Sequence, residues 1–429
     1  MAAFRLRLSA PATPTAAEAR SSFYWLTDSS SSFSTSLGPN LGSLGPVPDL
    51  NVDLVRIAAT VFAADRSVLR AGRGSDWNQR TFELEIPVSA TDAWSAVSND
   101  LEGVISFLTG DSWSLTFNDD EAPPEEVAMA TTRPKRVVLL SGGADSAIGA
   151  LMSRADLADD EQHILLSQFS AKTLAPTQRA IADQLVMLLP GPGQEHKQIR
   201  FGRNQKRLDG SKYPTEPSSR SRSLLFLALG LAAASLSKAP LWIPENGFAS
   251  LNPPLSPDRR GSLSTRTTHP AFLAGLVDVL NSVGAHSSFG NPFADSTKGE
   301  MFKQAATLVG AGPAASLLSE TNSCAHTGQR SFGISPKTPC GVCFGCVIRR
   351  ASFHTAGLQD ATTYISSNGD AGVQSWLDRQ SVIPAARSFV ALGVSRRDLI
   401  ALNLPPSYPL AGALDLCSRG IAELSGFLG

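Results

Sequence analysis

A chain of 429 residues is too long for one compact core, so its length predicts two or three domains. Its composition, with 42% hydrophobic and 17% charged residues, is that of an ordinary globular protein, and a formal net charge of -1 gives no overall attraction to nucleic acid or membranes. The longest apolar stretch, residues 224–236, is shorter than the roughly 20 residues that cross a bilayer, which favours a soluble protein without a membrane partner.

The first part of the chain mixes strand-like runs with turn-rich connections. Apolar and alternating patterns predict strands over residues 4–8, 52–62, 81–88 and 113–117, and residues 90–108 fit a helix. Residues 29–48 are rich in Ser, Gly and Pro and are expected to form a loop. The acidic, proline-containing stretch 119–126 has the composition of a linker, so we expect an α+β accessory domain over residues 1–132.

From residue 136 the pattern changes to strands that alternate with helices. Strands are expected at residues 137–140, 163–167 and 241–244, and helices at 147–153, 176–189 and 223–236. This alternation predicts an α/β unit, a parallel sheet with helices on both faces, over residues 133–319. Helical apolar spacing near the C-terminus predicts a helical region over residues 356–429.

A six-residue string separates the first of these strands from its helix: Ser141, Gly142, Gly143, Ala144, Asp145 and Ser146. Two adjacent glycines allow a tight turn in which backbone N–H groups and hydroxyls surround one anion at a helix N-terminus, so the string predicts a phosphate-binding loop. The alternative is a plain glycine turn with an Asp or Ser helix cap. Neither a Walker A loop nor a dinucleotide fingerprint is present.

Four of the five cysteines lie close together, with the spacing C-x15-C-x2-C-x2-C: Cys324, Cys340, Cys343 and Cys346. Four thiolates are enough for a closed tetrahedral Zn²⁺ site, which we expect within a module of residues 320–355. An iron–sulfur cluster and four unliganded cysteines are the alternatives. So few cysteines also indicate a reducing compartment, and the cytoplasm fits best.

The loop resembles the PP-loop of the ATP pyrophosphatase superfamily, whose fold is that of the adenine nucleotide alpha hydrolases. In combination with the cysteines, Arg349 and Phe353, it resembles the QueC family of 7-cyano-7-deazaguanine synthases over about residues 136–355. The stretch from Asn291 to Met301, which includes Lys298, is similar to the family's proline-then-Lys-x-Glu stretch. Arg222 and Ser223 stand where that family has its Arg-Asn element.

Other segments depart from the QueC pattern. Residues 169–171 replace the usual Tyr-Gly-Gln, and residues 245–270 do not follow the pattern of the queuosine-pathway enzyme. With its added N-terminal unit and tail, the chain looks more like the QueC-like proteins of bacterial anti-phage systems, of the QatC type. These departures leave the product open.

The resemblance implies ATP-dependent adenylation of 7-carboxy-7-deazaguanine followed by attack of an amine, which is ammonia in the biosynthetic family. Asp145 would help to place Mg²⁺, and Ser146 and Arg222 would act with it in catalysis. An operon-encoded protein could supply the amine, and the units that flank residues 136–355 would then hold it; the alternative is that they build a homo-oligomer.

The expected substrate-binding residues are Arg222, Ser223, Glu245, Asn246, Arg266, His269 and Lys298. Glu245 and Asn246 follow a strand at the sheet edge where ligands bind, although a helix-capping role is nearly as plausible on the pattern. For the two arginines the alternative is a solvated surface position, and for His269 it is local hydrogen bonding.

Two other classes of function compete with this interpretation. One is a PP-loop RNA-thiolating enzyme with an iron–sulfur cluster, which the low net charge and the lack of a basic run disfavour. The other is a non-catalytic protein that holds a nucleotide only as a structural ligand.

Overall fold

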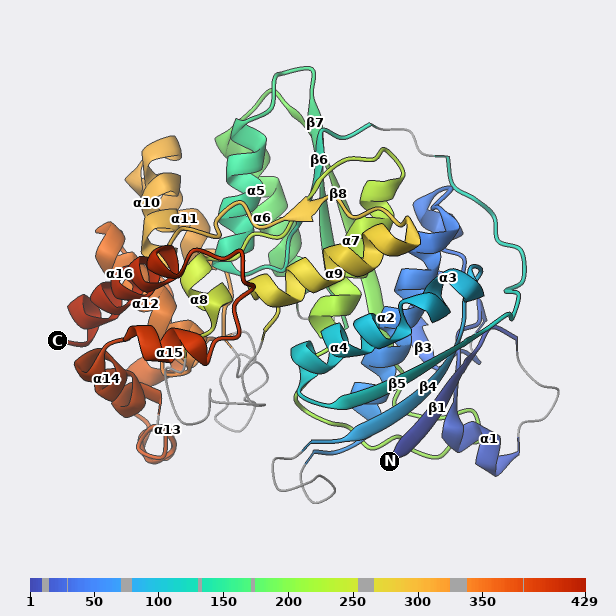
Figure 1. Cartoon of the computed structure of the whole chain (residues 1–429). Helices are drawn as coiled ribbons and strands as arrows, with labels where there is room; N and C mark the ends of the chain where they lie inside the picture. Colours follow the sequence, from blue (N-terminus) through green and yellow to red (C-terminus); the bar gives the residue numbers. More distant parts are fainter. Residues whose placement is uncertain are drawn as a thin grey trace.

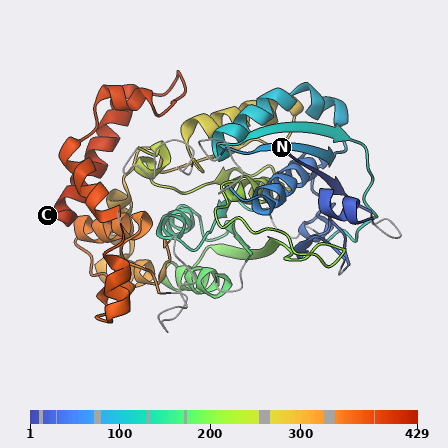
Figure 2. The ribbon, with the colours of Figure 1, turned by 90° about the horizontal axis from the view of Figure 1, so that it is seen from below.

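The computed structural model of the chain describes residues 1–9, 15–28, 30–70, 79–129, 133–170, 174–253, 266–324, 338–380 and 382–429. Its elements fall into three groups (Figure 1). The N-terminal elements lie on one side, a six-stranded sheet with its helices lies in the centre, and the C-terminal helices lie on the other side. The view from below shows the same order, with the N-terminal and C-terminal helices at opposite ends of the molecule (Figure 2).

The central sheet has the strand order β10-β9-β6-β7-β8-β3. Every neighbouring pair is parallel except β3 and β8, which are antiparallel. The strands are β3 (Phe33–Thr35), β6 (Arg136–Leu139), β7 (Gln162–Phe169), β8 (Gly193–Arg203), β9 (Leu241–Trp242) and β10 (Phe289–Gly290). The predicted parallel α/β sheet is therefore confirmed, with an added edge strand from the N-terminal part of the chain.

Helices cover both faces of this sheet, as predicted. Val137 and Leu139 of β6 belong to one hydrophobic cluster, and Val138 and Leu140 belong to another, because successive side chains of a strand point to opposite faces. The first cluster is completed by α2, α7 and α9, and the second by α5, α6, α10 and α11. Their bounds are α2 Asp49–Ser67, α5 Ala144–Ala155, α6 Ala175–Leu188, α7 Arg222–Ser235, α9 Pro270–Val283, α10 Lys298–Val309 and α11 Ala311–Glu320.

The N-terminal unit contains a second parallel sheet, of order β2-β1-β4-β5. Its strands are β1 (Ala2–Arg7), β2 (Ser22–Tyr24), β4 (Thr81–Pro87) and β5 (Ser112–Asn118). The predicted helix over residues 90–108 is divided into α3 (Thr91–Ala96) and α4 (Ser98–Thr109), and α1 (Ala16–Ser21) and the short 3₁₀ turn η1 (Gly42–Leu44) complete the unit. The unit contains both helices and strands, as expected, but its sheet is parallel and its strands alternate with helices, which is an α/β arrangement rather than an α+β one.

The strand expected at residues 52–62 is wrong, because these residues form the middle of α2. The helix packs against the N-terminal sheet and α7, and it is buried almost all round, with polar residues such as Asp53, Arg56 and Thr60 buried as well. Its apolar, partly β-branched run therefore looks like that of a buried strand.

The N-terminal unit shares its core with the central sheet. Apolar residues of β1, α2, α4, α7 and α9 belong to one cluster, and β3 extends the central sheet. A buried ionic network adds to this connection: Asp65 of α2 accepts hydrogen bonds from Arg80 and from the backbone N–H of Ser221, the residue before α7. The domain limits remain a prediction, and the expected boundary at residue 132 lies outside the described residues.

The C-terminal part of the chain is helical, as predicted. It contains α12 (Phe344–Ala356), α13 (Ala371–Leu377), α14 (Val382–Leu392), α15 (Arg396–Ile400), α16 (Leu410–Leu428) and the turn η5 (Ile365–Ser367). The long helix α16 packs against α12, α14, α15 and the short helix α8 (Gly247–Leu251). Cys417 lies buried in this third hydrophobic cluster, as a core residue should.

Candidate functional site

The glycine loop joins β6 to α5. Gly142 has a φ of +93°, a left-handed conformation that strains residues with a side chain. Ser146 Oγ accepts a hydrogen bond from Ser141 N at 3.2 Å, and Ser141 Oγ accepts one from Gly143 N at 3.3 Å, so two hydroxyls hold the turn. Gly143 at the N-cap has no side chain to cap α5, which leaves the first-turn amides available to an anion.

Asp145, in the first turn of α5, lies at the centre of a buried polar cluster. Its Oδ1 lies 2.9 Å from Lys298 Nζ, and its Oδ2 accepts a hydrogen bond of 2.8 Å from Asn246 Nδ2. Burial alone would raise the pKa of Asp145, but the charge of Lys298 and hydrogen bonds with Glu245 and Asn246 hold that pKa below its ordinary value. Asp145 is thus a buried carboxylate with a buried cation beside it.

Three separate elements bring this cluster together. Strands β6 and β9 are parallel neighbours, so the loop after β6 and the residues after β9 meet at the same edge of the sheet. Asn291, after β10, fixes Glu245 by accepting from its N–H and donating to its carbonyl. Lys298 is the first residue of α10, directly after its N-cap. Asn246 also caps α8 by accepting from Ala249 N, which is the capping role considered for it, and its substrate-binding role stays a prediction.

Arg222 at the start of α7 connects to the same loop through two glutamines. Its Nε donates to Gln168 Oε1 at 3.1 Å, and Gln178 Nε2 lies 3.3 Å from both the Gln168 and the Ser141 carbonyl oxygens. Burial, together with the charge of Arg66, lowers the pKa of Arg222. The neighbouring Ser223 is directed to the Arg220 carbonyl at 3.5 Å and joins none of these contacts.

Arg266 and His269 lie outside the polar cluster around Asp145, and their role in substrate binding stays a prediction. Arg266 donates to the Phe107 carbonyl at 2.9 Å and stacks on the Phe107 ring, so it connects to α4 of the N-terminal unit. His269 caps α9 by accepting from Ala271 N at 3.1 Å. Burial and the charge of Arg266 lower the pKa of His269 to about 4, which keeps its ring neutral. No hydrogen bond or ion pair in the described part of the chain joins either residue to the loop.

The four expected metal ligands lie together. The sulfur atoms of Cys324, Cys340, Cys343 and Cys346 are all within 4.8 Å of one another. Two of the separations, Cys340 to Cys346 and Cys343 to Cys324, are 3.9 Å, close to the roughly 3.8 Å edge of a tetrahedron with Zn–S bonds of about 2.3 Å. This donor set fits one Zn²⁺ ion, since a multi-iron cluster would separate its sulfurs further.

The cysteine module touches the glycine loop. Asn322 N donates to the Gly142 carbonyl at 2.9 Å, and Asn322 Oδ1 accepts from Cys324 N at 2.9 Å. The sequence pattern does not identify Asn322, Gln168 or Gln178 as site residues. It includes Asn291 only within the stretch that is similar to the QueC family, because no local pattern distinguishes any of the four.

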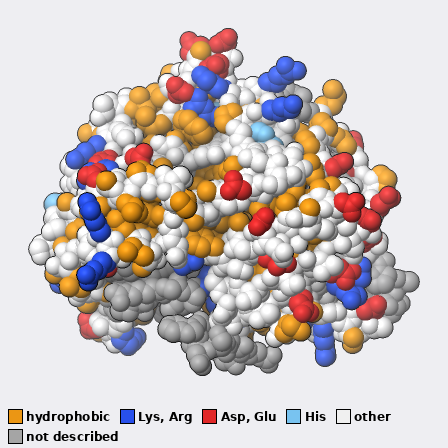
Figure 3. All heavy atoms as spheres, in the orientation of Figure 1, with side chains coloured by type: hydrophobic (Ala, Val, Ile, Leu, Met, Phe, Trp, Pro, Cys, Tyr) orange, Lys and Arg blue, Asp and Glu red, His pale blue; other side chains and the backbone are white. Residues whose placement is uncertain are grey.

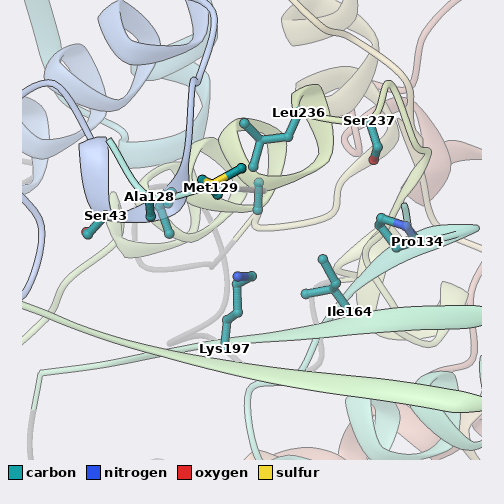
Figure 4. A pocket seen from close by; sticks show the side chains of 10 residues that line it. Ser43, Ala128, Met129, Pro134, Ile164, Lys197, Leu236 and Ser237 are labelled. Atoms are coloured by element: carbon teal, nitrogen blue, oxygen red, sulfur yellow. The ribbon is translucent and has the colours of Figure 1, made fainter. Parts of the chain in front are cut away.

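A small cavity elsewhere contains none of the expected site residues (Figure 4). Its volume is about 60 Å³, and among its ten lining residues Lys197 is the charged one. It lies beside the end of α7 and the start of β7, so it is unrelated to the loop. On the face shown in Figure 3, apolar side chains are widespread and charged side chains of both signs are interspersed.

The parallel sheet with helices on both faces, the glycine loop that opens α5 and the four-cysteine cluster define a PP-loop-like α/β protein. Over 252 aligned residues the chain is 29% identical to the 7-cyano-7-deazaguanine synthase of Cupriavidus taiwanensis, and the alignment covers 54% of this chain and 97% of that synthase. This similarity supports a QueC-like assignment for about half of the chain. No protein-family model matches the chain.

None of the helices in the described residues is both long and apolar enough to span a membrane.

Proposed function

We propose that this protein is an ATP-dependent, QueC-like ligase that adenylates the carboxylate of 7-carboxy-7-deazaguanine and transfers the acyl group to an amine. The observation that carries the proposal is the convergence of Asp145, Glu245, Asn246 and Lys298 on the first turn of α5, directly after the glycine loop. The similarity to a 7-cyano-7-deazaguanine synthase names the substrate class.

In this proposal the loop binds the phosphates of ATP through the first-turn amides of α5 and the hydroxyls of Ser141 and Ser146. A substrate carboxylate oxygen attacks the α-phosphorus and pyrophosphate leaves; the amine then attacks the acyl carbon and AMP leaves. Lys298 and Arg222 offset the negative charge of the phosphates and the carboxylate.

The carboxylates of Asp145 and Glu245 are the oxygen ligands that Mg²⁺ prefers, and we assign to them the Mg²⁺ that accompanies ATP. In the structure Lys298 Nζ occupies the position beside Asp145 Oδ1. The assignment therefore requires Lys298 to move from Asp145 toward the phosphates when the nucleotide binds.

The acceptor we favour is an amino group of an operon-encoded partner protein, within an anti-phage defence system of the QatC type in the cytoplasm. The support is that almost half of the chain lies beyond the region that matches the synthase. A ligase that delivers ammonia to a small acid needs only a closed pocket, whereas a protein acceptor needs an additional surface. A homo-oligomer remains the alternative use of these extra residues.

The test is incubation of the full chain with ATP, Mg²⁺, 7-carboxy-7-deazaguanine and each neighbour-encoded protein, followed by intact-mass spectrometry and measurement of AMP. We expect AMP release and an increase in the partner's mass by one deazaguanine acyl group. The second candidate is a biosynthetic synthase that uses ammonia, which the name of the relative favours. That candidate would replace this proposal if AMP is released, ammonium converts the acid to an amide or nitrile, and no partner protein carries an adduct.

Elemental analysis separates both candidates from the RNA-thiolating alternative. The sulfur separations support one zinc per chain. Iron with sulfide in freshly purified, brown protein would instead favour the thiolating enzyme. No AMP formation with any carboxylate would leave only the structural use of a nucleotide.

A further inference from the structure

A basic segment begins in the last four residues of β8 and continues beyond its carboxyl end, so the expectation that the chain lacks a basic run is wrong. Over residues 200–212 it carries five cations and one acid, although the whole chain has a net charge of -1. The cations are Arg200, Arg203, Lys206, Arg207 and Lys212, and the acid is Asp209. Arg200, Lys206 and Lys212 are exposed. No role in the proposed reaction accounts for this concentration of positive charge.

The segment leaves the sheet at the same edge as the glycine loop. Strands β6, β7 and β8 are parallel, and their register aligns Leu139, the last residue of β6, with Leu166 and Lys197. The end of β8 at Arg203 is therefore two strands to the side of β6 and roughly 20 Å further along the strand direction. Arg66 links the segment to the candidate site, because its charge acts on both Arg203 and Arg222.

Within the part of the chain that the structure describes, the positive charges of the segment are only partly balanced. In the described residues, no carboxylate oxygen lies within 4.0 Å of a charged nitrogen of the five cations or of Arg66. Asp209, the one acid in the segment, accepts hydrogen bonds from the hydroxyl and the backbone N–H of Ser211. These bonds, and to a smaller extent the charge of Arg207, lower the pKa of Asp209, so it offsets part of the charge of Arg207. Burial lowers the pKa of Arg203 to about 10, and repulsion by Arg66 and Arg207 contributes. Binding of an anion next to these cations would lower the electrostatic free energy of the segment.

Contacts of Arg203 and Arg207 hold the backbone of the segment in place. The guanidinium groups of Arg203 and Arg207 each lie 4.4 Å from the centre of the Tyr213 ring. Arg203 donates to the Asn204 and Pro214 carbonyl oxygens, and Arg207 donates to the Lys212 carbonyl oxygen. These contacts hold the backbone that presents the three exposed cations, so little conformational entropy is lost when a partner binds.

We propose that the basic segment, residues 200–212, binds an acidic stretch of the polypeptide that accepts the activated acyl group. This inference rests on the proposed function, because it names the partner of that same site. Binding here would hold the acceptor beyond the carboxyl end of β8, on the side of the sheet that also holds the loop.

An acidic polypeptide fits the segment better than a nucleic acid does. Single-stranded nucleic acids bind to proteins with exposed aromatic platforms, but Tyr213 is buried and its ring is covered by Arg203 and Arg207. Nucleic-acid interfaces also use many phosphate contacts over a large basic surface. Here five cations occupy one short segment of a chain with no net positive charge.

The experiment measures binding of a labelled peptide of about ten glutamates to the full chain by fluorescence anisotropy at low ionic strength, where exposed charges act most strongly. The variant Arg200→Glu/Lys206→Glu/Lys212→Glu should bind at least about tenfold more weakly, because attraction becomes repulsion. The control, Lys238→Glu/Arg396→Glu/Arg397→Glu, reverses three exposed cations elsewhere and should bind as the wild type does. Both variants should keep the wild-type rate of AMP formation without a partner.

Equal binding of the peptide by both variants would overturn the inference, and so would tighter binding of an oligouridine RNA of matched length. Peptide binding requires no chemical reaction, so the experiment can reject the ligase function and the acidic-partner inference independently of each other. AMP formation without peptide binding rejects the acidic-partner inference alone. Peptide binding without AMP formation rejects the ligase function and leaves a polyanion-binding surface.

Discussion

At the scale of single residues, the central feature of the site is an ion pair that is almost completely buried. Asp145 is 5% exposed and Lys298 is 8% exposed. Removing two charges from water costs free energy that the attraction between them often does not offset, so a buried ion pair is weak support for stability. A buried pair at the start of a helix is better explained by ligand binding. Each charge of the pair also needs the other, because either one alone would be buried without a counter-charge.

This dependence gives the first prediction. Lys298→Met should lower the free energy of unfolding by about 3 kcal/mol, because the Asp145 carboxylate stays buried without its cation. The double variant Asp145→Asn/Lys298→Met removes both charges and should recover most of that loss, yet both variants should lose AMP formation. Urea unfolding and AMP release measure the two effects. A double variant less stable than Lys298→Met, or one with wild-type turnover, would contradict the assignment.

Three histidines predict the pH dependence of stability. Burial lowers the pKa of His163, of His196 and of His269 from 6.5 to about 4. Between these pH values the unfolded chain binds more protons than the folded one, so stability falls as the pH falls from 6.5 toward 4, by up to about 1 kcal/mol per pH unit for each ring. His196→Gln should reduce this slope in denaturation measurements across that range, and an unchanged slope would refute the explanation.

At the scale of elements, the C-terminal helix α16 supports the helices that hold the partners of Asp145. Glu423 accepts hydrogen bonds from the N-cap hydroxyl of Thr297 and from Gly299 N, at the start of α10, next to Lys298. Gly420 lies so close to Phe248 of α8 that a Cβ atom would be 2.5 Å from the ring. The tail is therefore part of the site's support, in addition to any role in holding a partner.

Removing this support should affect the site more than the fold. Glu423→Ala should destabilise the protein by about 1–2 kcal/mol, as the loss of a helix cap does, and should raise KM for ATP because Lys298 is less well positioned. Asp415→Ala on the same helix removes only an exposed pair with Arg419 and should stay within about 0.5 kcal/mol of the wild type with unchanged kinetics. Equal kinetics for the two variants would show that α16 has no positioning role.

At the scale of the whole molecule, the N-terminal unit and the central sheet are joined by a polar network as well as by a common core. Both oxygens of Asp65 are used: Oδ1 accepts from Arg70 and Arg80, and Oδ2 accepts from the N–H and the hydroxyl of Ser221. Ser221 directly precedes Arg222. The N-terminal unit thereby helps to place a residue of the candidate site.

Breaking this network should affect folding and ligand binding together. Asp65→Asn should lower the free energy of unfolding by about 3 kcal/mol, because Arg70 and Arg80 lose a buried counter-charge, and should weaken ATP binding through Ser221 and Arg222. Asp92→Asn, an exposed acid of α3, serves as the control and should change neither quantity. Calorimetry of unfolding and nucleotide titration measure both, and normal stability of Asp65→Asn would exclude the structural role of the network.

The glycine loop, the cysteine spacing and most strands of the α/β unit were predictable from the sequence, because each of these signals lies within a few neighbouring residues. A turn of Gly142 and Gly143 before a helix, or three cysteines at Cys-x2-Cys spacing, restricts the backbone wherever it occurs. The apolar runs of β6 and β7 reflect burial on both faces of a parallel sheet.

Only the tertiary structure decided the remaining features. Helix α2 is buried from nearly every side, polar residues included, and the polar strand β8 forms because β7 pairs with it along eight residues. The pairing of Asp145 with Lys298 depends on contacts between helices far apart in the sequence, as does the capping of α10 by Glu423. Local patterns specify the chemical groups, but long-range packing determines which groups are desolvated together, and that desolvation turns separate side chains into a site.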